Sequence, residues 1–238
     1  MNTVFHLINL ACALLLILIT PIEGLIESKN KKKLSNKVKQ YHQQALWSLV
    51  PLVFVVFLLV LRLVGFDNIG IQRITINNDN YPKVIIVIGC VLYFAHLLYN
   101  LYSIIVLKFN KTARRKVSDS INKDIYAFLP ITKEERNAWK LVAISAGFSE
   151  EIIYRGYLFH IISIYFGSIH IAYSILISSF IFAIGHLYQG KELIKTFILG
   201  LLFGFYFSVF SSVLPVIIIH ILQDLIVTYI FNDDGVSA

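Results

Sequence analysis

Three ionisable side chains, Glu150, Glu151 and Arg155, interrupt an apolar stretch of the sequence. A carboxylate in apolar surroundings can act as a general acid or base, and an arginine can hold a neighbouring carboxylate in place. Glu151 and Arg155 are four residues apart, so on a helix they share one face and are expected to form an ion pair. Glu150 lies about 100° further round the helix and needs another partner, such as water, a metal ion or a histidine.

Histidines on later apolar stretches supply candidate partners. His186 lies near the end of one such stretch, and His220 precedes Asp224 by four residues on another, so these two share a helix face. Buried polar groups on separate helices can satisfy one another only by converging, which favours one shared site over scattered structural pairs. The residues of the predicted site are Glu150, Glu151, Arg155, His186, His220 and Asp224.

The elements that must position these residues are membrane-spanning helices. With 57% hydrophobic residues and a mean hydropathy of +0.73, the chain has too little polar surface for a water-soluble globule. About 20 apolar residues are needed to cross the hydrocarbon core of a bilayer. We therefore expect an all-α fold, a polytopic transmembrane helical bundle of about seven spans. The expected spans are residues 4–26, 46–66, 84–107, 138–159, 169–187, 193–210 and 213–231.

Two basic clusters predict how the bundle is oriented. One holds six lysines between residues 29 and 39, and the other covers residues 108–116. Basic loops remain in the cytoplasm, so we expect a multi-pass cell-membrane protein with its N-terminus outside and its C-terminus cytoplasmic. The lipid bilayer is the expected partner of these lysines, and no nucleic acid is expected. The small size and the lysine-based topology favour a bacterial plasma membrane.

The polar content divides the chain into three predicted regions. Residues 1–137 are expected to be an N-terminal membrane anchor with three spans, residues 138–231 a catalytic membrane core with four spans, and residues 232–238 a short polar tail. Cys12 and Cys90 both fall within expected spans, which argues against a disulfide framework or a cysteine metal site. Any bound metal would therefore use histidine and carboxylate ligands.

Three short motifs resemble one known family. They are Glu-Glu-x-x-x-Arg at residues 150–155, Phe-x-x-x-His ending at His186, and His-x-x-x-Asp from His220 to Asp224. In this order on successive apolar stretches they resemble the CPBP membrane protease family, which includes the CAAX-type prenyl endopeptidases and the bacteriocin-processing or immunity proteins. The resemblance covers residues 139–231.

The resemblance implies hydrolysis of a peptide bond within the membrane, in a membrane-associated peptide or protein. Glu150 would take a proton from a water molecule held with His186, and Arg155 would hold Glu151. His220 would stabilise the developing oxyanion or bind a metal. Family members with Asn at the position of Asp224 have an amide donor there, whereas an ionised Asp would repel an oxyanion. We therefore expect Asp224 to orient His220 or to join a metal site.

The sequence is compatible with a metal-dependent or a metal-independent site, and with two functions other than proteolysis. Glu150, His186 and His220 could hold a divalent metal such as zinc, although the compact His-Glu-x-x-His signature of soluble zinc proteases is absent from the sequence. One alternative function is a non-catalytic membrane immunity or binding protein of the same family. Another is a proton-coupled transporter, in which the same residues would form a proton relay.

Overall fold

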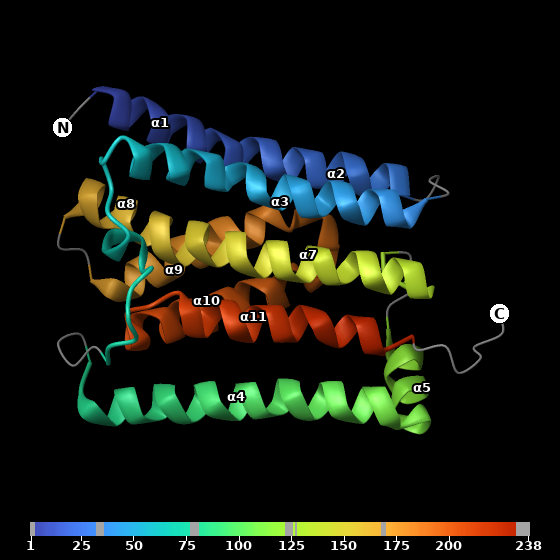
Figure 1. Cartoon of the computed structure of the whole chain (residues 1–238). Helices are drawn as coiled ribbons and strands as arrows, with labels where there is room; N and C mark the ends of the chain where they lie inside the picture. Colours follow the sequence, from blue (N-terminus) through green and yellow to red (C-terminus); the bar gives the residue numbers. More distant parts are fainter. Residues whose placement is uncertain are drawn as a thin grey trace.

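The structure, a computed structural model, describes residues 3–31, 36–76, 81–121, 126, 128–167 and 170–231. Every regular element within this part of the chain is helical, and the long helices lie side by side as a bundle (Figure 1). The predicted all-α helical membrane bundle is thereby confirmed. The predicted polar tail, 232–238, lies outside the described residues.

The helices follow the expected spans closely. In chain order they are α1 (Thr3–Leu14), α2 (Thr20–Lys31), α3 (Lys37–Val60), α4 (Lys83–Phe109), α5 (Lys111–Ser120), α7 (Lys133–Glu151), α8 (Leu158–Phe166), α9 (Ile171–Gly185), α10 (Leu193–Phe210) and α11 (Leu214–Ile226). Two π-helical turns, η1 (Leu15–Ile19) and η3 (Ile152–Tyr157), join α1 to α2 and α7 to α8. Short 3-10 turns are η2 (Asp67–Ile69), η4 (Leu187–Glu192) and η5 (Val227–Tyr229).

Not every expected span is a long apolar helix. Among the described residues, four segments are long and apolar enough to cross a membrane, namely Thr3–Ile26, Lys37–Val60, Lys83–Phe109 and Leu187–Phe210. The apolar helices Ile171–Gly185 and Leu214–Tyr229 are shorter. The expected fourth span is part of the continuous path from α7 through η3 to α8, which carries the charges of the predicted site.

The second span differs most from its expected bounds. We expected residues 46–66, but α3 begins at Lys37 and ends at Val60. The earlier start follows from Asn36, whose side chain caps the helix by accepting a hydrogen bond from Lys39 N at 3.0 Å. The earlier end coincides with Arg62, whose φ of 54° is left-handed and cannot continue a helix.

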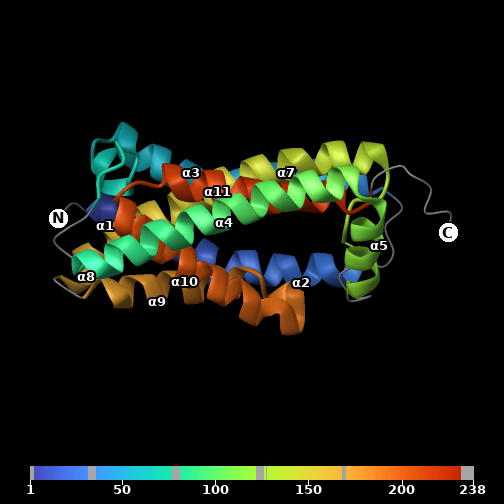
Figure 2. The ribbon, with the colours of Figure 1, turned by 90° about the horizontal axis from the view of Figure 1, so that it is seen from below.

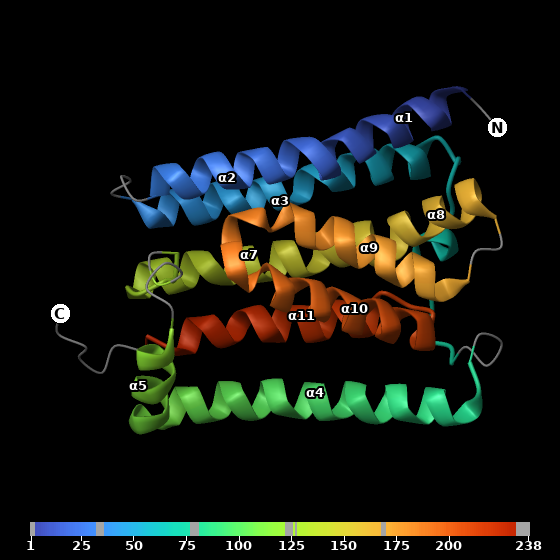
Figure 3. The ribbon, with the colours of Figure 1, turned by 180° about the vertical axis from the view of Figure 1, so that it is seen from behind.

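The long helices form two rows. Viewed from below, α3, α7 and α11 lie in one row and α2, α9 and α10 in the other, while α4 packs along the edge formed by α10 and α11 (Figure 2). The view from behind shows that the α9–α10 hairpin is short: its connection, η4, ends before the end of the bundle at which α2, α3 and α5 lie (Figure 3). The bundle therefore has fewer helices at that end.

The described parts of both basic clusters belong to this same end of the bundle. The end of α2, the start of α3 and α5 lie there, and the start of α1 lies at the opposite end (Figures 1 and 3). At that opposite end, residues 61–76 fold back over the α10–α11 turn, where Val213 N donates to Gly70 O at 2.9 Å and Thr75 N donates to Phe210 O at 3.1 Å. Membrane orientation itself stays a prediction.

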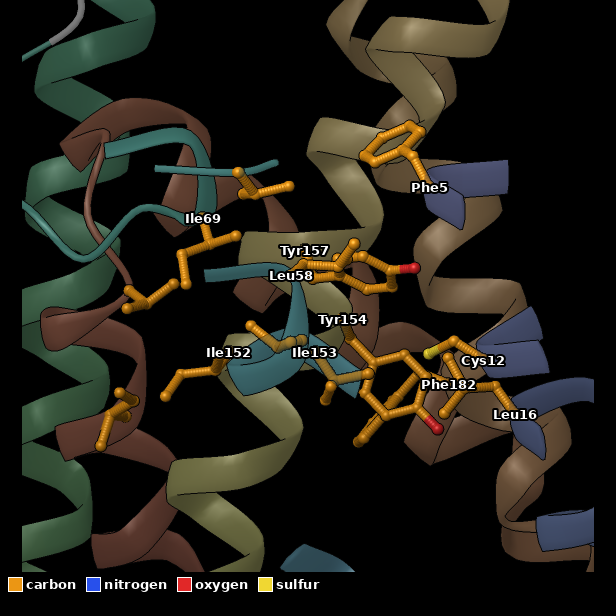
Figure 4. Packing of buried hydrophobic residues seen from close by; sticks show 14 residues of the cluster. Phe5, Cys12, Leu16, Leu58, Ile69, Ile152, Ile153, Tyr154, Tyr157 and Phe182 are labelled. Carbon is orange, nitrogen blue, oxygen red and sulfur yellow. The ribbon is translucent and has the colours of Figure 1, made fainter. Parts of the chain in front are cut away.

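The N-terminal helices share a hydrophobic core with the later ones. Phe5, Cys12 and Leu16 lie in one buried cluster with Tyr154 of η3 and Phe182 of α9 (Figure 4). Because this cluster spans the expected boundary between anchor and core, α1 and η1 directly support the turn that follows the two glutamates. The predicted division of the chain into three regions stays a prediction.

Candidate functional site

The two glutamates lie at the end of α7, where the helix changes its winding. A capping box between Thr132 and Glu135 starts α7, and the helix continues to Glu151 before widening into the π-helical turn η3. Such single π turns inside helices are frequent at functional sites. The turn places Arg155 beneath Glu151, with Arg155 Nη1 donating to Glu151 Oε1 at 2.8 Å. The expected ion pair is present.

The ion pair is completely buried, and His220 completes it. Glu151 and Arg155 are each 0% exposed. His220 Nδ1 lies 2.6 Å from Glu151 Oε1, the same oxygen that accepts from Arg155. One carboxylate oxygen therefore links α7 to α11, and the charge-assisted bonds offset the cost of removing these groups from water.

The remaining contacts of Arg155 fix its guanidinium from two further helices. Nη2 donates to Gly200 O of α10 at 3.3 Å. The guanidinium carbon lies 4.5 Å from the ring centroid of Phe182 and 5.4 Å from that of Phe203. These are cation–π distances. Glu151 Oε2 and Arg155 Nε have no hydrogen-bond partner among the described residues, and water molecules are their natural partners.

The bond to Glu151 determines which ring nitrogen of His220 carries a hydrogen. An ionised carboxylate can only accept, so the proton between the two lies on His220 Nδ1. The other ring nitrogen, Nε2, faces two further carboxylates: it is 3.8 Å from Glu150 Oε2 and 3.6 Å from Asp224 Oδ2. Both distances exceed that of a hydrogen bond, so these side chains surround Nε2 without binding it directly.

Glu150 differs from its neighbour in environment. Its side chain is 21% exposed, whereas that of Glu151 is fully buried. Glu150 lines a cavity of about 490 Å³ between α2, α3, the end of α7 and the start of η4. A side chain there can meet water or a ligand. Glu150 and Glu151 therefore lie on different sides of α7, as expected from the rotation of about 100° between neighbouring residues of a helix.

His186 reaches the same cavity from another helix. It caps the C-terminus of α9, and its Nδ1 lies 2.8 Å from Phe182 O. A carbonyl oxygen only accepts, so Nδ1 carries the hydrogen and Nε2 is an acceptor in the neutral ring. Helix α9 ends at Gly185, and His186 lines the cavity directly after that end.

Asp224 lies one turn beyond His220 on α11. Its side chain is 31% exposed, and its Oδ2 lies 3.6 Å from His220 Nε2. Its backbone is held independently, because Trp139 Nε1 donates to Asp224 O at 3.0 Å. Asp224 is thus placed near the ring that it is expected to orient, and that role stays a prediction.

The possible metal ligands do not form a metal site. In the described part of the chain, no group of three or more His, Cys, Asp or Glu side chains is arranged to hold a metal ion. Glu150, His186 and His220, the ligands considered from the sequence, thus do not fit a zinc centre as they are placed. Metal dependence stays a prediction, and no step of the mechanism below uses a metal.

The opposite wall of the cavity was not predicted from the sequence. This wall comes from the predicted anchor, with Thr20, Glu23 and Gly24 on α2 and with Gln44 and Trp47 on α3. One signal could have revealed it: Glu23 is a carboxylate within an otherwise apolar span, and intramembrane carboxylates are rarely without a role.

Comparison with known proteins identifies the part of the chain that holds the site. Residues 136–226 match the family described as type II CAAX prenyl endopeptidase, Rce1-like. No curated protein and no solved structure matches the chain. The matched residues include all six residues of the predicted site and agree with the resemblance to the CPBP family. Residues 136–226 of the chain therefore form an Rce1-like domain, similar to the CAAX-type membrane proteases.

Proposed function

We propose that this protein is an intramembrane endopeptidase in which Glu150 and His186 activate the water that attacks a peptide bond. One observation carries the proposal: Glu150 and His186 both line the cavity of about 490 Å³, while Glu151, Arg155 and His220 lie buried behind them. The cavity supplies room for substrate and water. The buried network supplies a rigid support.

The two cavity-lining acceptors suit one water molecule. Glu150 accepts one of its hydrogens, and His186 Nε2 accepts the other, which directs an oxygen lone pair toward the substrate. Proton transfer to Glu150 leaves a hydroxide, whose oxygen bonds to the scissile carbonyl carbon as the carbonyl π electrons move onto oxygen. Collapse of this intermediate breaks the C–N bond, and Glu150 returns the proton to the leaving amine.

We propose that His220, which is 5% exposed and lies behind Glu150, stabilises the oxyanion through Nε2 once substrate is bound. When its ring carries both protons, Nε2–H can donate to the carbonyl oxygen of the substrate, and the carboxylates of Glu151 and Asp224 offset the charge of the ring. Arg155 acts through Glu151 and is a positioning residue. Asp224 is likewise proposed to orient His220 and not to donate to the oxyanion.

The proposed substrate is a membrane-associated protein or peptide. The family is one of proteases that act in membranes, and the cavity lies toward the end of the bundle that carries both basic clusters. By the positive-inside rule this end is proposed to face the cytoplasm. Substrate would then reach Glu150 from the cytoplasmic side or from lipid.

The proposal is tested by cleavage of a membrane-peptide library with purified protein in liposomes. We expect Glu150→Gln and His186→Ala each to lower kcat about 10²–10⁴-fold, the range for loss of a general base. The matched controls are Glu134→Gln and His42→Ala, which change exposed residues outside the cavity lining and should retain activity. A chelator arm tests metal dependence. No cleavage by folded wild-type protein would favour the immunity or binding role instead.

A further inference from the structure

We propose that the α2–α3 wall of the cavity selects a substrate with a basic residue near the scissile bond, and that Glu23 binds this residue. The proposal rests on the peptidase function proposed above, and it adds the substrate class. It concerns residues outside the matched range 136–226, so the family assignment does not supply it.

The placement of Glu23 is the first observation. It lies on α2 within the candidate span Thr3–Ile26 and lines the cavity. No hydrogen bond or ion pair joins its side chain to any residue whose side chain the structure describes, which leaves out the side chains of residues 27–35. Glu23 is exposed and lies three residues before the end of this span, so its carboxylate is accessible to a cation that enters the cavity.

The remaining polar lining of the cavity is the second observation. Gln44 Oε1 is buried and has no hydrogen-bond partner among the described residues. Glu150 and the Nε2 atom of His186 are further acceptors on the opposite side. Such a lining favours a ligand rich in donors, and both a peptide backbone N–H and a Lys or Arg side chain meet this requirement.

The charges of the cavity differ from those of the whole chain. The chain has a net charge of +7, yet the described residues that line the cavity include two carboxylates and no Lys or Arg. The nearby cation, Arg155, is neutralised by Glu151 behind the cavity wall. Electrostatic complementarity therefore favours a basic substrate segment in the cavity and disfavours an acidic one.

Trp47 adds an aromatic surface to the same wall. It lines the cavity from α3 and is 54% exposed. The face of an indole ring attracts Lys and Arg side chains, most strongly where water is excluded. A basic side chain in the cavity can thus pair with the carboxylate of Glu23 and pack its alkyl part on the apolar lining.

The test uses fluorescently labelled peptides with one apolar core sequence, reconstituted in neutral liposomes. The peptides carry Lys, Gln or Glu in turn at each position within three residues of the cleaved bond. Both cleavage and binding are measured for the wild type, Glu23→Gln and Glu23→Lys, with Glu134→Gln as the matched control. An ion pair of about 1.4 kcal/mol corresponds to a tenfold preference, so we expect about a tenfold lower Kd and KM for the best Lys peptide than for its Gln counterpart.

Substitution of Glu23 should change the preference itself. Glu23→Gln should reduce the ratio of the two Kd values to about one, Glu23→Lys should favour the Glu peptide, and Glu134→Gln should keep the Lys preference. A wild type without Lys preference in binding, or a preference that persists in both Glu23 variants, would overturn the inference. Lack of cleavage despite selective binding would instead overturn the proposed peptidase function alone.

Discussion

The buried side and the cavity side of α7 place two neighbouring residues of the same type in opposite surroundings. Glu151 is fully buried and shares one oxygen between Arg155 and His220, whereas Glu150 borders a cavity and has no partner within hydrogen-bond distance among the described side chains. A rotation of about 100° separates the two. Adjacent identical residues can therefore divide positioning and chemistry between them.

The buried side of α7 should contribute mainly to stability, and the cavity side mainly to activity. A buried ion whose partner is removed leaves an uncompensated charge, so the buried side should determine stability. A carboxylate in contact with a water-accessible cavity can lose its charge at little cost, so the cavity side should determine activity. Substitutions on the two sides should thus give opposite patterns of stability and rate.

The largest expected effect is on the buried side, at Arg155. Arg155→Met keeps much of the side-chain volume but leaves Glu151 buried with one partner fewer, and should lower the free energy of unfolding by about 3–5 kcal/mol. Unfolding of the purified protein by SDS in mixed micelles measures the change. Glu150→Gln, on the cavity side, should stay within about 0.5 kcal/mol of the wild type. Equal losses of unfolding free energy in both variants would show that the two sides of α7 do not differ in their contribution to stability.

The elements that hold the site were largely predictable from the sequence. Apolar length alone places α10 at 193–210, the bounds that the structure has. The spacing of four residues between Glu151 and Arg155 predicted their ion pair, because contacts within one helix depend only on helix geometry.

The contacts between elements could not be predicted in the same way. Which carboxylate His220 binds depends on how α7 and α11 are rotated against each other, and the expectation of a histidine for Glu150 did not foresee the bond to Glu151. The π turn η3 is too short, at six residues, to show a period of its own in the sequence. Likewise, Gln44 is an ordinary polar residue near a helix start in the sequence, and only the packing of α3 places it beside the cavity.

A smaller effect is expected where α7 and α11 touch, at Gly147. A Cβ added there would lie 2.6 Å from Ile221 Cγ1 and 3.1 Å from Ile221 N, so α11 must move away from α7. Overpacking of this kind typically costs about 1–3 kcal/mol. Gly147→Ala should lower SDS resistance by this amount and should also reduce cleavage, because His220 moves with α11.

Gly24→Ala is the counterpart of this substitution on the cavity side. The added Cβ would lie 3.0 Å from Cδ1 of Tyr188, whose ring would need to shift by only a few tenths of an ångström. Alanine also favours a helix over glycine by up to about 1 kcal/mol. Gly24→Ala should therefore leave stability equal or slightly higher. A loss as large as that of Gly147→Ala would show that the cavity wall is as tightly packed as the buried side.

Another small effect is expected on the far side of α11, where α4 packs. Asn100 is 1% exposed, and its Nδ2 donates to Ile219 O at 3.3 Å, while its Oδ1 has no hydrogen-bond partner among the described residues. Hydrogen bonds between membrane helices average about 0.6 kcal/mol, and Asn100→Leu removes this bond together with an unsatisfied acceptor. Its stability should thus stay within about 1 kcal/mol of the wild type.

Cleavage by Asn100→Leu tests whether the contact of Asn100 with α11 helps to position His220. His220 is bound to Glu151 at 2.6 Å, a shorter and charge-assisted contact, so α7 should determine where the ring lies. The kcat of Asn100→Leu should then match that of the wild type in the liposome assay. If kcat instead fell as far as in Gly147→Ala while the protein stayed folded, the support for His220 would come from α4 as much as from the buried side of α7.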